Sequence, residues 1–350
     1  MADIAEPIRR ASHAGVRIAG TGAYLPEKVL TNADLERLMD TSDEWIVQRT
    51  GVRERRICED GDSLAGISAA ALKSALKSAG LKPSDLDLLI VGSVSSDMTC
   101  PSAACQVLDM LAGDPEMDRG SAGAFDLTAA CCGFVYGLNV AHEMIRGGAY
   151  KTVGVVGSEI LSRFQQYDTA GRGTAIIFGD GAGAAILRAT DDPSKGQLAQ
   201  AMYSDGTRWK DLFIPNHEPR DFPGGTRATE DVLPLGYMRM NGRAVFRFAV
   251  GTFGDLIQET LDKAGVTAQD VSLFVCHQSN VRILDAARDR FGIPPERMPV
   301  NIDRLGNTSA ASVPLLYNEL VQSGRAREGE LVMFVAFGAG LTWTSSLWRI

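Results

Sequence analysis

The chain has 350 residues, of which 45% are hydrophobic and 22% charged, proportions that are ordinary for a globular protein. This length permits one large domain or two domains of usual size, and the formal net charge of −8 argues against nucleic acid as a partner. The longest apolar run, residues 331–343, is shorter than the ~20 residues that a spanning helix needs, so we expect no membrane association.

Two features of the sequence bear on where the protein is located and on the state of its cysteines. The N-terminal segment MADIAEPIRRASHAG lacks the apolar stretch of a secretory signal peptide. Six cysteines in a chain of this length do not make a disulfide framework. Together these features predict a cytoplasmic protein whose thiols are reduced.

An internal repeat is the first clear pattern along the chain. Residues 72–91 (LKSALKSAGLKPSDLDLLIV) align without a gap to residues 257–276 (IQETLDKAGVTAQDVSLFVC). Each copy predicts an amphipathic helix, a glycine that ends it, a short polar link and a buried apolar strand. A chance likeness between two unrelated helix–turn–strand units is the alternative.

Alternation of helices with continuously apolar strands is typical of sheets covered on both faces, the α/β class. Two such halves indicate a pseudo-symmetric, five-layered αβαβα sandwich. The polar segment 190–198 separates the halves, so we expect an N-terminal half over residues 1–190 and a C-terminal half over residues 191–350.

The run AFDLTAACCGFVYGLNVA (124–141) contains the candidate nucleophile, Cys131. Strand character over residues 124–128 gives way to apolar residues at helical spacing, so Cys131 lies where a strand turns into a helix. The free N–H groups and the dipole at a helix N-terminus favour the thiolate, which is the attacking species. A small buried hydrophobe is the alternative, and adjacent cysteines lack the usual spacing of metal ligands, so we expect no metal.

Two polar residues further along are candidate partners of Cys131. His277 directly follows an apolar strand, at the end where open α/β sheets place their active sites. Asn307 lies in GNTSAAS (306–312), at another strand-to-helix turn. If they converge, a neutral histidine and an asparagine can both donate hydrogen bonds to a carbonyl oxygen or an enolate. A structural histidine and a helix-capping asparagine are the alternatives.

The cysteine elbow, HQSN (277–280), GNTSAASVP (306–314) and AFGAGLTW (336–343) resemble, in this order, the β-ketoacyl-[acyl carrier protein] synthase III family. The resemblance extends over roughly residues 16–350. Further similar segments are GTGAYLP (20–26), TSDEWIVQRTGVRER (41–55), PSAACQ (101–106) and GRGTAIIFGDGAGAAIL (171–187).

This resemblance implies a homodimer of thiolase-fold subunits with no metal or organic cofactor. It implies a decarboxylative Claisen condensation of an acyl-CoA primer with malonyl-[acyl carrier protein]. The products would be 3-ketoacyl-[acyl carrier protein], CO₂ and CoA, and the reaction would initiate fatty-acid synthesis.

The resemblance also implies roles by position. Cys131 would take the acyl group, His277 and Asn307 would bind the malonyl thioester, and the backbone N–H groups of Cys131 and Ala339 would hold the tetrahedral oxyanion. The CoA contacts that it implies are Trp45 and Arg172 with the adenine, Arg49 with a phosphate, and Gly242 and Asn280 along the pantetheine channel.

Two further positions bear on specificity. Cys100 stands where the family often has a bulky residue that closes the acyl pocket from across the dimer, so a smaller side chain would admit a longer or branched primer. Because the carrier protein is acidic, a basic docking face is expected, and Arg247 and Arg282 fit it. A merely solvated charged surface is the alternative.

Three other functions remain compatible with the Cys-His-Asn set. A specialised relative on the same fold could use another primer or acceptor in secondary metabolism. A thioesterase or amidase could use the same three residue types. The third is a catalytically silent partner subunit or an acyl-binding scaffold.

Overall fold

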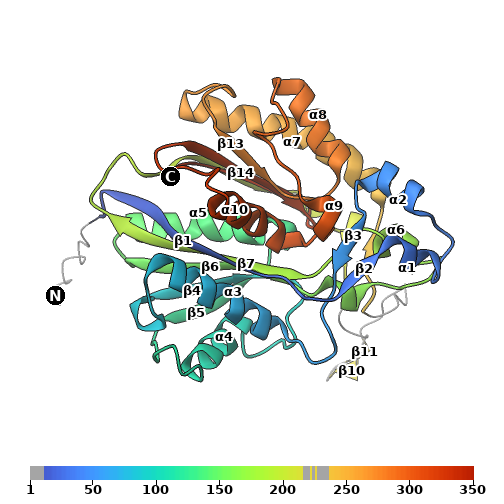
Figure 1. Ribbon diagram of the computed structural model, residues 1–350, viewed down its shortest axis with the longest axis horizontal. Coiled ribbons are helices and arrows are strands. Elements are labelled where there is room, and N and C mark those ends of the chain that lie inside the picture. Colours follow the sequence, from blue (N-terminus) through green and yellow to red (C-terminus); the bar gives the residue numbers. More distant parts are fainter. Residues whose placement is uncertain (1–11, 216–220, 223–224, 227–235) are drawn as a thin grey trace.

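The computed structural model describes residues 12–215, 221–222, 225–226 and 236–350 (Figure 1). Its first sheet has the order β1-β7-β6-β4-β5. The bounds of these strands are β1 (Gly15–Tyr24), β7 (Gly181–Thr190), β6 (Thr152–Glu159), β4 (Leu88–Gly92) and β5 (Gly123–Leu127). Strand β4 runs parallel to both β5 and β6, whereas β7 is antiparallel to β6 and to β1.

The second sheet has the order β13-β14-β15-β8, with β13 parallel to β14 and the other pairs antiparallel. Its strands are β13 (Leu273–Cys276), β14 (Leu331–Gly338), β15 (Thr342–Arg349) and β8 (Gly196–Ser204). The chain passes from the first sheet to the second between Thr190 and Gly196.

The helices form three layers, one on the outer face of each sheet and one between the two sheets (Figure 1). The outer face of the first sheet packs on α3 (Leu64–Ala79) and α4 (Ala103–Ala112). Between the sheets lie α5 (Gly133–Arg146) and α10 (Ser312–Gln322), and the second sheet's outer face packs on α7 (Gly242–Ala264) and α8 (Val281–Phe291). One apolar cluster fills each outer interface, and a single further cluster packs α5 and α10 against both sheets. The five-layered αβαβα sandwich predicted from the sequence is thus confirmed.

Shorter elements complete the described part of the chain. They are β2 (Val29–Thr31), α1 (Asn32–Glu36), α2 (Asp43–Thr50), β3 (Glu54–Arg56), η1 (Pro83–Asp85), η2 (Ala130–Cys132), η3 (Leu161–Phe164), α6 (Arg172–Ala175), η4 (Gly206–Asp211), β9 (Leu212–Phe213), β10 (Asp221–Phe222), β11 (Gly225–Thr226), β12 (Arg239–Met240), α9 (Ile302–Leu305) and η5 (Ser309–Ala311). None of the helices in these described ranges is long and apolar enough to cross a membrane.

The internal repeat has the same geometry in both halves. Gly80 ends α3 and Gly265 ends α7, and both adopt φ 67° and ψ 32°. This left-handed conformation carries no steric cost for glycine. In the polar link that follows, Asp85 accepts the N–H of Lys82 and Asp270 accepts the N–H of Thr267, each at 2.8 Å. The two glycines and two aspartates therefore direct the chain from helix to strand in the same way twice.

Candidate active site

Cys131 lies on the short turn η2, between β5 and α5. The preceding Ala130 has a φ of 47°, in the left-handed region that side chains rarely adopt. This turn places Cys131 directly before the N-terminus of α5. Its first hydrogen bond runs from the Cys132 N–H to the Ala129 carbonyl (3.1 Å). Among the described residues the N–H of Cys131 has no backbone acceptor, so it can bind an oxyanion.

The backbone at the end of β14 approaches Cys131 closely. A Cβ atom added to Gly338 would lie 2.8 Å from the Cys131 nitrogen, so no side chain fits there. Ala339 follows and lines the same cavity as Cys131. The two residues predicted to form the oxyanion hole therefore face one space.

His277 follows β13 and is 1% exposed. Its backbone N–H donates to the Val335 carbonyl (2.8 Å), which extends the pairing of β13 with β14. The Nδ1 atom lies 2.6 Å from the hydroxyl oxygen of Ser312. Burial lowers the pKa of His277 to about 3, so the imidazole is neutral at physiological pH.

Ser312, which the sequence analysis did not single out, controls the tautomer of His277. Its hydroxyl oxygen also lies 2.9 Å from the Ser309 carbonyl. The hydroxyl has one proton: donated to Nδ1 of His277, it leaves Nε2–H as a donor toward the cavity, whereas donated to Ser309 it leaves Nε2 as an acceptor.

Asn307 is held on both its backbone and its side chain. The backbone N–H donates to the Ile177 carbonyl (2.9 Å), and the carbonyl accepts the N–H of Gly179 (3.0 Å). The side-chain oxygen Oδ1 accepts the N–H of Ser309 (2.8 Å). Because Oδ1 is engaged, the Nδ2 amide group is left as a donor for a ligand.

Glu159, at the end of β6, is a buried carboxyl group that the sequence analysis missed. It is 0% exposed. One oxygen, Oε2, accepts hydrogen bonds from the hydroxyls of Ser95 (2.6 Å) and Ser93 (3.2 Å) and from the N–H of Val94 (3.2 Å), while Oε1 accepts the hydroxyl of Ser309 (2.9 Å). Burial raises the pKa of Glu159 to about 7. No local sequence pattern distinguishes it from other strand-end acids.

The environment of Cys131 corrects one expectation. Burial raises the pKa of the Cys131 thiol to about 12, while the neighbouring side chain of Ser309 lowers it and the charge of Glu159 raises it further. Burial thus favours the thiol over the thiolate that the sequence led us to expect, because the short turn lies inside the packed interface between the halves.

Two cavities meet at Cys131. The larger, of about 560 Å³, is lined mostly by apolar side chains such as Leu161, Phe164 and Phe178. The smaller, of about 250 Å³, is lined by His277 and Asn307 at one end, and its lining extends to residues near the surface. His277, Asn307 and Cys131, predicted to act together, therefore share one cavity.

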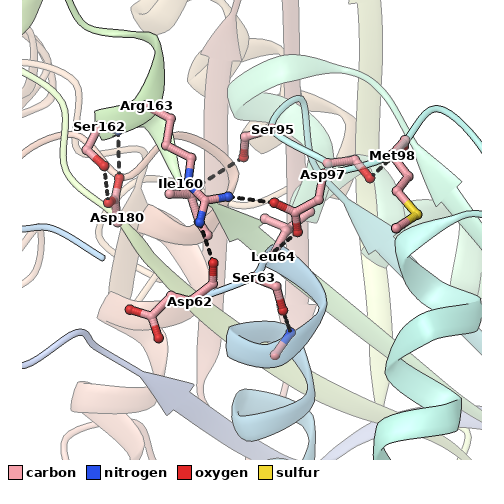
Figure 2. A network of polar contacts seen from close by, with 12 residues as sticks. Asp62, Ser63, Leu64, Ser95, Asp97, Met98, Ile160, Ser162, Arg163 and Asp180 are labelled. Atoms are coloured by element: carbon pink, nitrogen blue, oxygen red, sulfur yellow. Dashed lines mark hydrogen bonds and ion pairs between the residues drawn. The ribbon is translucent and has the colours of Figure 1, made fainter. Parts of the chain in front are cut away.

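Figure 2 shows the polar contacts that fix the wall of the larger cavity. Asp97, which lines the cavity, accepts the N–H of Leu64 (2.7 Å) at the start of α3. Asp97 also forms an ion pair with Arg163 (2.5 Å) of η3. Next to Arg163, Ser162 donates to Asp180 (2.6 Å). These contacts tie the loop after β4 to η3 and α3.

The outer part of the smaller cavity contains the predicted CoA residues. Arg49 and Arg172 both stack on Trp45, with guanidinium carbons 4.4 Å and 4.8 Å from the ring centre. Asn280 donates to the Arg49 carbonyl (2.8 Å), and Gly242 begins α7. All except Arg172 line the cavity, and Arg172 joins the group through Trp45.

Arg247 and Arg282 are exposed on α7 and α8. The Arg282 guanidinium carbon lies 5.1 Å from the ring centre of Phe246, which lines the smaller cavity. Among the described residues, neither arginine forms an ion pair, whereas Arg288 and Arg290 do, with aspartates. Free positive charge therefore remains beside the cavity lining.

Cys100 is exposed and does not line the larger cavity, although the neighbouring Met98 and Thr99 do. A gate at Cys100 would have to act on a second subunit, as the resemblance implies. Within the described ranges, the structure contains no cluster of three or more His, Cys, Asp or Glu residues that could hold a metal ion.

Two covered sheets, a buried cysteine elbow and a facing His-Asn pair define a condensing enzyme of the thiolase fold. The family profile of 3-oxoacyl-[acyl-carrier-protein] synthase III matches residues 125–206, and the profile of its C-terminal part matches residues 261–350. The β-ketoacyl-[acyl-carrier-protein] synthase III 1 of Bacillus anthracis is 43% identical over 328 residues, which are 94% of this chain and 96% of that protein.

Solved structures agree. The 3-oxoacyl-[acyl-carrier-protein] synthase III of Aquifex aeolicus matches with a TM-score of 0.85 and 40% identity, over 96% of this chain and 100% of that one. The priming β-ketosynthase of the R1128 polyketide pathway matches with a TM-score of 0.86 and 32% identity, over 98% and 99% of the two chains. The chain belongs to the β-ketoacyl-[acyl carrier protein] synthase III family. It is an acyltransferase that condenses an acyl primer with a malonyl thioester, with loss of CO₂.

Proposed function

We propose that Cys131 takes the acyl group from acyl-CoA and that His277 and Asn307 bind the malonyl thioester delivered by acyl carrier protein. The observation that carries this assignment is the position of Cys131 where a wide apolar cavity meets a narrow one lined by His277 and Asn307. The acyl chain would occupy the first cavity and the pantetheine arm the second.

The steps follow from these positions. Cys131 Sγ attacks the acyl-CoA thioester, and CoA leaves through the narrow cavity. The malonyl thioester then enters, and its carbonyl oxygen accepts hydrogen bonds from Nδ2 of Asn307 and from Nε2–H of neutral His277, the tautomer in which the Ser312 hydroxyl donates to Nδ1. Loss of CO₂ leaves an enolate that these donors stabilise. Its carbon attacks the acyl–Cys131 thioester, and the N–H groups of Cys131 and Ala339 hold the oxyanion until the C–S bond breaks.

CoA would bind along the narrow cavity. Trp45 and Arg172 offer stacking surfaces to the adenine, and Arg49 offers its charge to a phosphate. Gly242 and Asn280 would border the pantetheine arm. Arg247 and Arg282 would meet the acidic carrier. In this proposal acyl-CoA is a substrate, and the reaction needs no metal or organic cofactor.

The proposed active form is a cytoplasmic homodimer. Strand β5 is at the edge of the first sheet, and Ala124, Phe125 and Leu127 on it are partly exposed. Met98 and Met110, on neighbouring segments, are 53% and 42% exposed. An apolar, unpaired edge strand is a ready surface for a second copy.

Incubation with malonyl-[acyl carrier protein] and acyl-CoAs from acetyl to dodecanoyl, branched chains included, tests the assignment. Intact-mass spectrometry should show a transient acyl adduct on Cys131 and a 3-ketoacyl carrier product. Cys131→Ala should remove both. Acylation without condensation would contradict the roles given to His277 and Asn307, and hydrolysis of the adduct without decarboxylation would indicate a thioesterase.

The second candidate is a priming enzyme of secondary metabolism that uses another primer or acceptor. Two observations support this candidate: the similarity to the R1128 priming β-ketosynthase and the size of the apolar cavity, about 560 Å³. A primer preference for long or branched chains in the same panel, together with poor use of acetyl-CoA, would support it over fatty-acid initiation.

A further inference from the structure

The proton of the Cys131 thiol needs an acceptor when the acyl group is loaded. Asn307 is not a base, and burial holds the pKa of His277 at about 3, which makes it a weak one. Glu159 is a buried carboxyl group that accepts a hydrogen bond from Ser309, a residue lining the same cavity as Cys131, and the mechanism above does not use it. Its hydrogen-bonding neighbours are the hydroxyl and N–H donors of Ser93, Val94, Ser95 and Ser309.

Ser309 connects Glu159 to the reacting residues. The turns η5 and η2 pack against each other, and the Ser309 and Cys131 side chains line the same cavity. The side chain of Ser309 lowers the pKa of Cys131. The single hydroxyl proton of Ser309 is donated to Glu159 Oε1 at 2.9 Å, which leaves the hydroxyl oxygen able to accept the proton of the thiol. Ser309 therefore lies between a thiol that must lose a proton and a carboxyl group that can take one.

The backbone of Ser309 is strained in a way that fixes this position. Its φ is 50°, in the left-handed region, and such a conformation persists only where the surroundings hold it. Its N–H donates to Asn307 Oδ1 (2.8 Å), and its carbonyl is 2.9 Å from the Ser312 hydroxyl that contacts His277. The bond to Glu159 is the contact that fixes the hydroxyl.

We propose that Glu159 accepts, through the hydroxyl of Ser309, the proton that Cys131 loses when it is acylated. The inference rests on the proposed role of Cys131 as acyl acceptor. As Sγ bonds to the thioester carbon, the S–H proton passes to Ser309 Oγ while the Ser309 proton passes to Glu159 Oε1. The bond from that carbon to the CoA sulfur then breaks. The departing thiolate takes the proton back by the same route, and Glu159 ends as a carboxylate.

The surrounding charges are compatible with this relay. The negative charge of Glu159 raises the pKa of the Cys131 thiol. Protonation of Glu159 removes this effect. Asp97 is paired with Arg163, Asp180 is held by Ser162, and His277 is neutral. Burial raises the pKa of Glu159 to about 7, which suits proton transfer near neutral pH.

The test is the pH dependence of acylation alone, measured by rapid quench and intact mass with acyl-CoA and no malonyl thioester. In the unchanged protein the rate should rise with pH and level off above an apparent pKa near 7. Glu159→Gln keeps the size and the hydrogen-bond acceptor but cannot take the proton. Its acylation rate should be lower by on the order of 100-fold at pH 7.5. This rate should keep rising with pH and should not level off near pH 7.

Asp87→Asn is the control. Asp87 is a carboxyl group at the opposite end of β6 from Glu159, where it accepts the N–H groups of Lys151 (2.7 Å) and Thr152 (2.9 Å), and it lines neither of the two cavities that meet at Cys131. Its variant should keep the levelling of the acylation rate near pH 7. Ser309→Ala should lose the levelling of the acylation rate near pH 7, as Glu159→Gln does. It is the variant to measure if Glu159→Gln fails to fold.

An unchanged pH profile in Glu159→Gln, or in Ser309→Ala, would overturn the relay while leaving the proposed function intact. Absence of any acyl adduct on the unchanged protein would instead overturn the proposed function, and the relay with it.

Discussion

Ser312 sets the hydrogen-bonding state of His277 without reaching the substrate cavity. The hydroxyl lies 2.6 Å from Nδ1, so its removal frees the ring to change tautomer and orientation. We expect Ser312→Ala to lower the condensation rate on the order of 10-fold and to leave acylation of Cys131 within about 2-fold. Single-turnover assays with and without malonyl-[acyl carrier protein] separate the two steps. Ser323→Ala, at the far end of α10, removes a hydroxyl bonded to the Glu319 carbonyl (2.7 Å) and should change neither.

His277 also links stability to pH. Its folded-state pKa, about 3, lies below the ordinary value of 6.5, so between these values the unfolded chain binds a proton that the folded chain does not. The contribution to stability is fully present above pH 6.5 and is lost as the pH falls toward 3. His277→Gln should therefore lose less stability than the unchanged protein between pH 7 and pH 4, as measured by urea unfolding. Parallel stability curves would contradict the buried, neutral state of the ring.

At the scale of elements, the repeat makes a prediction about two glycines. Gly80 and Gly265 have the same backbone angles, and an added Cβ would meet no atom within 4 Å at either position. Alanine should therefore cost only the strain of a positive φ, about 1 kcal/mol at each site. Gly61→Ala is the control, because Gly61 also has open space but no positive φ. Unequal losses from the two repeat glycines in urea unfolding would show that the helix ends are not equivalent.

The loop that precedes α4 makes a second prediction, which depends on the dimer. Cys100 is exposed and does not line the larger cavity of its own subunit, so in the proposed homodimer it would act on the partner's acyl cavity. Cys100→Phe should shift the primer preference toward shorter chains, because the larger ring would fill space that the thiol leaves open. The acyl-CoA panel measures this shift. An unchanged chain-length preference would show that Cys100 is not the gate.

At the scale of the whole molecule, the exposed arginines of α7 and α8 predict how the carrier approaches. Arg247→Glu and Arg282→Glu should each raise the KM for malonyl-[acyl carrier protein] on the order of 10-fold, because a charge attractive to the acidic carrier becomes repulsive. The KM for acyl-CoA should stay the same. Lys151→Glu, at the opposite end of β6 from Glu159, is the control for a change in net charge. Equal effects on both substrates would argue against this docking face.

Local sequence patterns predict the layered α/β fold, the two related halves and the Cys131 elbow. These features depend on local patterns: helical or continuous apolar spacing, glycines at helix ends and small residues at a sharp turn. The family resemblance added which residues act together. His277, Asn307 and Cys131 do line one cavity in the structure, while their individual roles stay predictions.

The protonation states of the site residues depend on contacts between segments that are distant along the chain. Glu159 and Ser309 are 150 positions apart along the chain, and no spacing rule joins them until β6 and η5 pack together. The pKa values of Cys131, His277 and Glu159 are set by burial, which is a property of the assembled interface between the halves. The cavity volumes likewise follow from how side chains from distant segments fill, or leave unfilled, the space around Cys131.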